Sequence, residues 1–186
     1  MTTMLAAQEV SDADVVREVL GGRTEAYATL VRRYQGFLFR HAERMTGSGD
    51  EAADIVQMAF VKGYRNLERC RNPERVGAWL FRISANLCKD FLKNRRRLNL
   101  SLQDTPAVTT KRDNPGDAAE QSEMGTKIDH ALERLAADQR EAFVLKHVEG
   151  RSYKEMSDML EASVPALKMR VHRAREELQT LLAVYR

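Results

Sequence analysis

The sequence predicts an all-α protein made of two small helical domains joined by a flexible linker. Apolar residues recur every three or four positions through most of the 186 residues, which is the period of an amphipathic helix. Only 10 glycines and 4 prolines interrupt this pattern, and runs of β-branched residues are short. The stretch 98–123 is polar with almost nothing to bury, and it separates two segments that can each form a core.

Four amphipathic helices are predicted in the first half of the chain. They cover residues 11–20, 24–45, 50–69 and 73–97. Gly21 and Gly22 stop the first of them, and Gly47 follows the end of the second. Ser48 and Glu51 have the spacing of a capping box for the third. Together these helices predict a compact helical domain that ends near Arg97.

The fourth of these helices carries two kinds of side chain at helical spacing. Its predicted buried stripe is Val76, Trp79, Leu80, Ile83, Leu87 and Phe91. A second face carries polar residues, namely Arg75, Arg82, Asn86, Lys89, Lys93 and Arg96. All of these except Asn86 are cationic, which suits contact with a phosphate backbone and with one base. The alternative is the solvated face of an ordinary surface helix.

The second half predicts a helix-turn-helix. Helical periodicity resumes at Met124, a further helix covers 137–147, and a short helix over 152–160 is capped by Ser152 and Glu155. After a brief turn, a final helix begins at Val164 and buries Leu167, Val171, Ala174, Leu178 and Leu181. Its other side exposes Lys168, Met169, Arg170, His172, Arg173 and Arg175. Such a helix can enter the major groove of DNA, although helix-turn-helix units also have purely structural roles.

Composition and motif searches exclude several classes of protein. The net charge of +3 does not imply nucleic acid by itself, but basic residues concentrate in 89–97 and 168–175. We expect a cytoplasmic protein without membrane insertion, because the sequence shows no signal peptide and no apolar run of spanning length. Cys70 and Cys88 are expected to be reduced thiols, and a redox switch is the open alternative.

No catalytic constellation is evident in the sequence. It has no phosphate-binding glycine loop, and its four histidines are dispersed without any Cys/His spacing typical of zinc. Glu176 and Glu177 are adjacent in a predicted helix and point apart. We therefore expect no active site, no metal site and no cofactor.

Two sets of motifs resemble the extracytoplasmic-function (ECF) sigma factors, a small class of bacterial RNA polymerase sigma subunits. The first set is DIVQMAF at 54–60 followed by WLFRISANL at 79–87. The second set is DQREAF at 138–143, EGRSY at 149–153 and VPALKMRVHRAR at 164–175. Their order and the intervening linker are those of this family.

The resemblance implies a division of the chain and a function. Residues 1–22 would be an N-terminal tail and short helix, 23–97 sigma region 2, 98–123 the flexible linker, and 124–186 sigma region 4 with its helix-turn-helix. The protein would bind core RNA polymerase, direct it to specific promoters and promote DNA melting to initiate transcription. It would be a specificity subunit without an active site of its own.

The resemblance also implies roles for matching positions. The residues that would dock on the clamp of the largest polymerase subunit are Asp54, Gln57, Phe60, Val61 and Tyr64. Those that would hold the single-stranded non-template strand of the minus-ten region are Arg71, Asn72, Arg82, Asn86, Lys89, Lys93 and Arg96. Those that would read the duplex minus-thirty-five element are Lys146, Tyr153, Lys154, Lys168, Arg170, His172, Arg173 and Arg175.

Further expected partners are the flap of the second polymerase subunit and an anti-sigma factor, which commonly sequesters members of this family. Three positions depart from the family pattern. Met58 stands where an acidic residue is usual, and Tyr64 stands where tryptophan is common. Glu161 stands in a turn that usually bears glycine, and a positive φ there would cost about 1 kcal/mol.

Two other functions fit the residues alone. One is a repressor or activator that binds duplex DNA through 164–175 and never contacts polymerase. The other is a helical adaptor whose basic faces bind acidic proteins.

Overall fold

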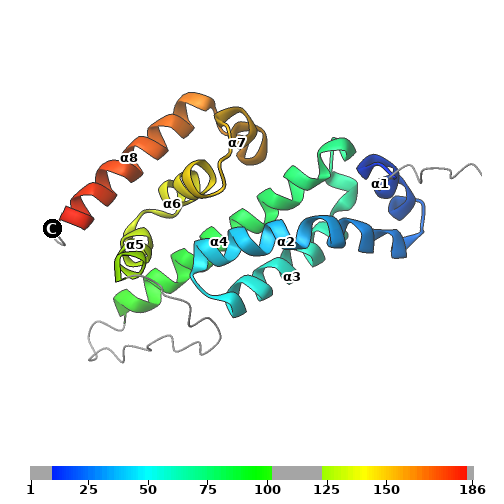
Figure 1. Ribbon diagram of the computed structural model, residues 1–186. Coiled ribbons are helices and arrows are strands. Elements are labelled where there is room, and N and C mark those ends of the chain that lie inside the picture. The colour runs from blue at the N-terminus through cyan, green and yellow to red at the C-terminus, as the bar shows by residue number, and fades with distance from the viewer. Residues whose placement is uncertain (1–9, 102–122, 184–186) are drawn as a thin grey trace, which may run out of the picture.

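The computed structural model describes residues 10–101 and 123–183, and within these ranges every regular element is helical. This confirms the all-α prediction. The helices form two groups, the first from α1 to α4 and the second from α5 to α8 (Figure 1). The longest helix, α4 (Val76–Ser101), runs the length of the first group and faces the second group as well.

The first group contains α1 (Asp12–Leu20), α2 (Tyr27–Thr46), α3 (Gly49–Arg65) and α4, with short 3-10 turns η1 (Thr24–Ala26), η2 (Leu67–Arg69) and η3 (Pro73–Arg75). Ser48 caps α3 by accepting a hydrogen bond from the Glu51 N–H at 3.4 Å. The end of α3 was predicted at residue 69 but falls at Arg65. The Asn66 side-chain amide donates to the Lys62 carbonyl at 2.9 Å, and this local bond closes the helix there.

The core of the first group lies between α2, α3 and α4. The α4 side chains buried in it are Val76, Leu80, Phe81, Ser84, Ala85 and Cys88. The predicted stripe is thus partly wrong, because Trp79, Ile83, Leu87 and Phe91 are only half-buried. Helix α4 contacts α2 and α3 of the first group and α6 and α7 of the second. Its apolar face is therefore wider than the single predicted stripe.

A close helix contact depends on Gly77. A Cβ atom placed there would overlap the ring of Tyr34 on α2. We expect Gly77→Ala to lower the free energy of unfolding by about 1–3 kcal/mol, because the core would have to shift. Gly36→Ala is the matched control, since its Cβ would meet only the Arg40 guanidinium at 3.4 Å, and we expect it to stabilise by about 0.5–1 kcal/mol. Urea unfolding of both variants checks this, and equal shifts would contradict the packing.

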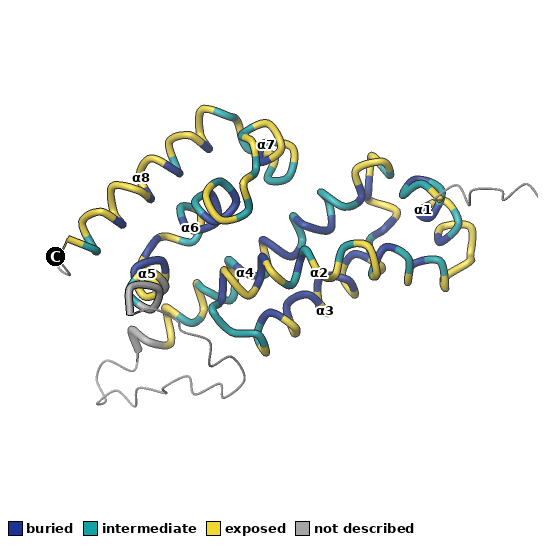
Figure 2. The backbone as a smooth tube through the Cα atoms, in the orientation of Figure 1, coloured by how far each residue is buried: buried dark blue, intermediate teal, exposed yellow. Residues whose placement is uncertain are grey.

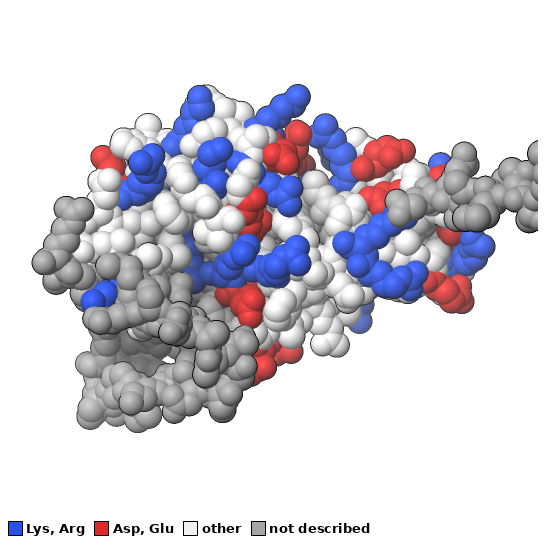
Figure 3. Space-filling view, in the orientation of Figure 1, with Lys and Arg blue, Asp and Glu red and all other residues white. Residues whose placement is uncertain are grey.

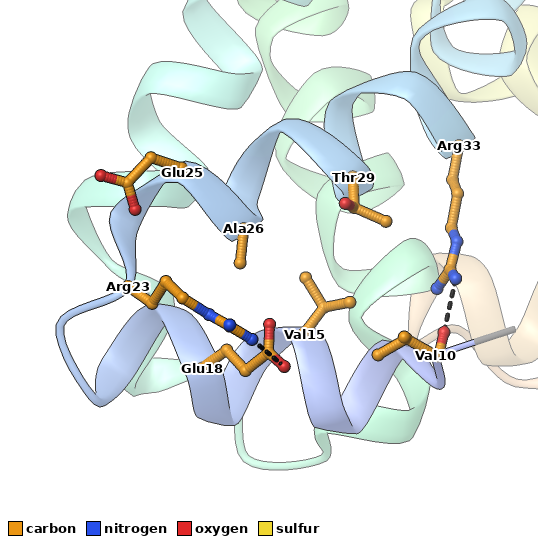
Figure 4. A pocket seen from close by; sticks show the side chains of 8 residues that line it. All are labelled: Val10, Val15, Glu18, Arg23, Glu25, Ala26, Thr29 and Arg33. Carbon is orange, nitrogen blue, oxygen red and sulfur yellow. Dashed lines mark hydrogen bonds and ion pairs between the residues drawn. The ribbon is translucent and has the colours of Figure 1, made fainter. Parts of the chain in front are cut away.

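The N-terminal helix is fastened to α2 by polar contacts. Arg23 pairs with Glu18, and the Arg33 guanidinium donates to the Val10 carbonyl across a shallow hollow lined by Val15, Ala26 and Thr29 (Figure 4). Arg33 also lies 2.6 Å from Asp12. These contacts hold the start of the described chain against the helical bundle.

The second group contains α5 (Glu123–Arg134), α6 (Ala137–Phe143), η4 (Val144–Val148), α7 (Tyr153–Leu160) and α8 (Val164–Ala183). The element η4 is a π-helical turn that prolongs α6. The predicted capping box of α7 is confirmed, because Ser152 Oγ accepts from the Glu155 N–H at 3.2 Å and the Glu155 carboxylate accepts from the Ser152 N–H at 2.8 Å. Glu161 has φ 50°, so the turn before α8 takes the strained left-handed conformation considered above.

The two groups share one buried cluster. Ala142, Leu145, Met156, Leu167 and Val171 of the second group are buried together with the core of the first. In Figure 2 the buried positions of α6 and α4 lie on the sides that face each other. A smaller cluster joins α5 to the later part of α8.

The predicted linker lies only partly within the described structure. Helix α4 continues to Ser101, beyond the predicted boundary at 97, because the basic run after Lys93 stays helical. Helix α5 begins at Glu123. The rest of the predicted linker, 102–122, lies outside the described residues, as do 1–9 of the predicted tail and 184–186.

Candidate nucleic-acid interface

Helix α8 presents a basic surface on the side opposite its buried stripe. Leu167, Val171, Ala174 and Leu178 are buried. The exposed residues near its start and middle are Lys168, Met169, His172, Arg173 and Arg175, while Arg170 is half-buried. Ser163 begins the helix by accepting from the Ala166 N–H at 3.4 Å. This is the arrangement that a groove-reading helix requires.

Residues from three elements meet beside α8. Lys146 Nζ lies 4.9 Å from the centroid of the Tyr153 ring, and Lys168 Nζ lies 5.8 Å from the same ring. Both cations are held over an aromatic face. Burial lowers the pKa of His147, and Arg175 and Lys146 lower it further, which reflects a positive local potential. Lys154 is exposed on α7. In Figure 3 lysines and arginines gather over the upper helices of this face.

The loop between η2 and η3 is a second exposed element. Arg71 and Asn72 are exposed, whereas Cys70 is buried with its thiol 3.5 Å from the Asn72 carbonyl. The loop borders a cleft of about 480 Å³ whose other walls are Trp79 on α4 and residues at the end of α7. Arg75 and Arg82 line this cleft together with Asp158 and Glu161, so its walls carry charges of both signs.

The cationic stripe on α4 divides into two edges. Asn86, Lys93 and Arg96 are exposed to solvent. Arg82 and Lys89, together with Arg75 in η3 just before the helix, turn towards carboxylates of the second group. The structure therefore does not bring all predicted minus-ten residues onto one open surface.

The contacts of the second edge were missed by sequence reasoning. Arg75 lies 3.1 Å from Asp158, Arg82 pairs with Glu161, and Lys89 Nζ lies 3.3 Å from Glu141. Lys89 also lies 3.5 Å from Asp138. Nothing in the local periodicity indicates which carboxylates face α4, because the contacts join residues 49 or more positions apart in the chain.

Ionisable groups are also buried where the two groups of helices meet. His41 Nδ1 lies 2.8 Å from Glu149 Oε1, and the His41 ring packs 4.6 Å from Phe81. Arg140 donates to the Arg44 carbonyl at 2.8 Å. Glu141 is fully buried, and burial raises the pKa of its carboxyl above the ordinary value, although Lys89 and His41 act in the opposite direction.

The raised pKa of Glu141 predicts a pH dependence of stability. The folded state keeps the proton to higher pH than the unfolded state, so this carboxyl lowers the free energy of unfolding as pH rises from about 4.5 through the folded-state pKa. We expect Glu141→Gln to remove that loss, so the stability of the wild type should fall relative to the variant as pH rises above about 4.5. Thermal unfolding across this range checks it, with Glu177→Gln as the exposed control. Parallel curves for wild type and Glu141→Gln would contradict it.

Helix α3 offers a different kind of surface. Asp54, Gln57, Val61 and Tyr64 are exposed on one side of it, with Val61 at 44% and Tyr64 at 42%. Met58, 47% exposed, belongs to the same side although it departs from the family pattern. This side of α3 is called the α3 surface below.

Phe60 was predicted with this set but is a core residue. It is only 8% exposed, and its ring lies 6.5 Å from that of Tyr27 in an edge-on contact. Phe60 therefore supports the α3 surface from beneath and is not part of it. Periodicity could have shown this, because Phe60 shares the buried side of the helix with Val56 and Gly63.

The two cysteines are free thiols in the fold. Burial raises the pKa of Cys88 to about 12, and burial also raises the pKa of Cys70. The thiolate is the reactive form, so both side chains are poor nucleophiles near neutral pH. Across residues 10–101 and 123–183, no three ligand-type side chains converge as a metal site, and no helix has both the length and the apolar character to cross a membrane.

Comparisons with known proteins agree with this geometry. The family model described as Sigma-70 region 2 matches residues 30–98, and the one described as Sigma-70, region 4 matches residues 126–178. The ECF RNA polymerase sigma-E factor of Escherichia coli strain K12 is 30% identical over 182 residues, covering 92% of this chain and 94% of that protein. The ECF RNA polymerase sigma factor SigE of Mycolicibacterium smegmatis is 31% identical over 83% of this chain, which spans only 60% of that relative.

Two solved structures are similar over most of the chain. CnrH, in complex with the cytosolic domain of CnrY, has a TM-score of 0.63 at 28% identity and covers 93% of this chain and 97% of that one. The sigma factor RpoE of Bartonella quintana, in complex with the anti-sigma factor NepR, has a TM-score of 0.58 at 28% identity and covers 86% and 98%. The chain belongs to the extracytoplasmic-function family of RNA polymerase sigma factors, which act in transcription initiation.

Proposed function

We propose that this sigma factor binds core RNA polymerase through the α3 surface, reads duplex promoter DNA with α8, and captures one separated strand with α4 and the η2–η3 loop. The observation that carries the proposal is the presence of two basic surfaces on different helices. The α8 surface has the shape and charge of a groove-reading helix. The α4 surface joins the exposed cations Lys93 and Arg96 to the exposed amide of Asn86.

Each surface suits a different form of DNA. Lysines and arginines on α8 can bind guanine edges and phosphates of an intact duplex. A row of cations with one exposed amide among them suits a single strand with one base turned out. Opening would need no nucleotide hydrolysis by the factor, because binding of the unstacked bases would offset the few kcal/mol that opening costs.

The α3 surface supports docking on the clamp of the largest polymerase subunit. It combines exposed apolar side chains with Asp54 and Gln57, as the centre and rim of a protein interface do. Residues of the second group would contact the flap of the second subunit. CnrH and RpoE were each solved with a second protein, and RpoE with an anti-sigma factor. We infer that an anti-sigma protein also binds this factor, which would act in the cytoplasm as a specificity subunit without an active site.

Gel filtration and run-off transcription test the proposal together. The full chain should co-elute with cognate core polymerase, and the mixture should start transcripts at discrete sites within a promoter library. Separate elution peaks combined with duplex binding would instead support a repressor or activator that acts alone. Co-elution without specific transcripts would refute the role in promoter recognition.

A further inference from the structure

We propose that acidic side chains of the second group mask one edge of the α4 stripe, so that the free factor binds single-stranded DNA weakly. This rests on the proposed function of α4. Arg75 and Arg82 are paired with Asp158 and Glu161, at the end of α7 and in the turn that follows it. Lys89, about two helical turns further along α4, is paired with Glu141 and Asp138 of α6. Each cation on this edge thus has a carboxylate where a phosphate would otherwise bind.

The turn at Glu161 gives independent support. Within the described residues Glu161 is the only residue other than glycine with a positive φ, at 50°. A glycine would adopt this conformation without strain, whereas glutamate cannot. Backbone strain of this kind persists where the side chain has another use. Here the Glu161 carboxylate lies against Arg82, so the strained residue contributes one charge of the mask.

The closed arrangement leaves the duplex-reading surface free. Lys168, His172, Arg173 and Arg175 are exposed while Arg82 and Lys89 are engaged. In Figure 3 acidic and basic side chains adjoin in the middle of the face, below the basic cluster at the top. The free factor would therefore retain its duplex-binding surface, and would expose the whole α4 stripe only when the two groups of helices separate.

The contact between the two groups of helices buries polar atoms that favour its opening. Besides apolar side chains it buries Glu141, His41 and Glu149. Glu141 Oε1, His41 Nε2 and Glu149 Oε2 have no hydrogen-bond partner among the described residues. Buried polar atoms without partners destabilise the state that buries them, because they lose water without replacement. Separation would return these atoms to water, which offsets part of the lost apolar contact.

The test removes two of the four masking carboxylates without changing the helices. The double variant Asp158→Asn with Glu161→Gln removes two carboxylates from positions that are exposed apart from these pairs. The matched control, Glu25→Gln with Glu43→Gln, removes the same charge from exposed positions on the first group. Both are made in the full chain and compared by circular dichroism, which should show unchanged helix content.

Two measurements decide the outcome. Small-angle X-ray scattering should give a larger radius of gyration for Asp158→Asn/Glu161→Gln than for wild type. Its affinity for fluorescent dT12, read by polarisation, should rise about threefold to tenfold, because each exposed pair shifts the closed-to-open ratio by a small factor. The control should keep the wild-type radius and change dT12 affinity less than about twofold, as expected for its charge alone.

Two results would overturn the mask. One is an unchanged radius of gyration, and the other is dT12 affinity no higher than that of the control pair. A run-off assay of the wild type with core polymerase is run alongside. Failure of that assay would refute the proposed sigma function, whereas the scattering result reports on the closed arrangement independently of polymerase.

Discussion

Replacing Asn86 and Lys93 by alanine is expected to impair promoter opening strongly while core polymerase still binds the factor. Both side chains are exposed on the open edge of α4, so their removal should not disturb the core. We expect run-off transcription to fall about tenfold to hundredfold, because a base contact is worth about 1–3 kcal/mol and a phosphate contact is lost with it. Lys89 is kept in this design, since its removal would leave the buried Glu141 without its cation.

The matched control is Arg32→Ala with Gln35→Ala, which removes a cation and an amide from exposed positions on α2. Transcription by this control should stay close to wild type. Full activity of Asn86→Ala/Lys93→Ala would show that the open edge of α4 does not hold the separated strand. Loss of co-elution with core polymerase would mean that the effect arises at docking.

The second large effect is expected from Val61→Asp on the α3 surface. Val61 is 44% exposed beside Met58 and Tyr64, so a carboxylate is tolerated in the free chain but would be buried against polymerase. We expect the affinity for core polymerase to fall about thirtyfold or more, as a loss of 2 kcal/mol or more at the centre of an interface implies. Competition against a labelled wild-type factor measures this.

Val10→Asp is the control for that substitution, because Val10 is also an exposed valine, at 47%, and its contact to Arg33 uses the backbone carbonyl. It should bind polymerase as the wild type does. If Val61→Asp also bound normally, docking through the α3 surface would be wrong.

Local sequence features predicted the fold class and most helix positions. Helical periodicity and caps such as Ser48 and Ser152 act over three or four residues, so they are visible without tertiary information. The core-facing side of α4 was less well predicted, because α2, α3 and the second group all pack on it. Phe81 and Cys88 are fully buried although they lie beside the predicted stripe.

Of the candidate site, the basic face of α8 was predicted from the sequence, whereas the ion pairs between the two groups of helices were not. The basic face of α8 follows from one buried stripe, and Arg173 and Lys168 lie where periodicity puts them. The pairing of Arg75 with Asp158 could not be predicted, because it depends on how two helical groups that are distant in the chain pack together. The neighbouring sequence of an exposed carboxylate does not show whether it faces solvent or a cation that is distant in the chain.

Footprinting on one promoter recovered by run-off transcription separates the two proposed DNA surfaces most directly. Asn86→Ala/Lys93→Ala should keep nuclease protection of the duplex near minus thirty-five and lose permanganate reactivity of thymines near minus ten. Lys168→Ala/Arg173→Ala should lose the upstream protection, because both cations lie on the exposed face of α8. The account would be contradicted if Asn86→Ala/Lys93→Ala opened the duplex as the wild type does, or lost the upstream protection instead. Either result would show that α4 and α8 do not bind single-stranded and duplex DNA separately.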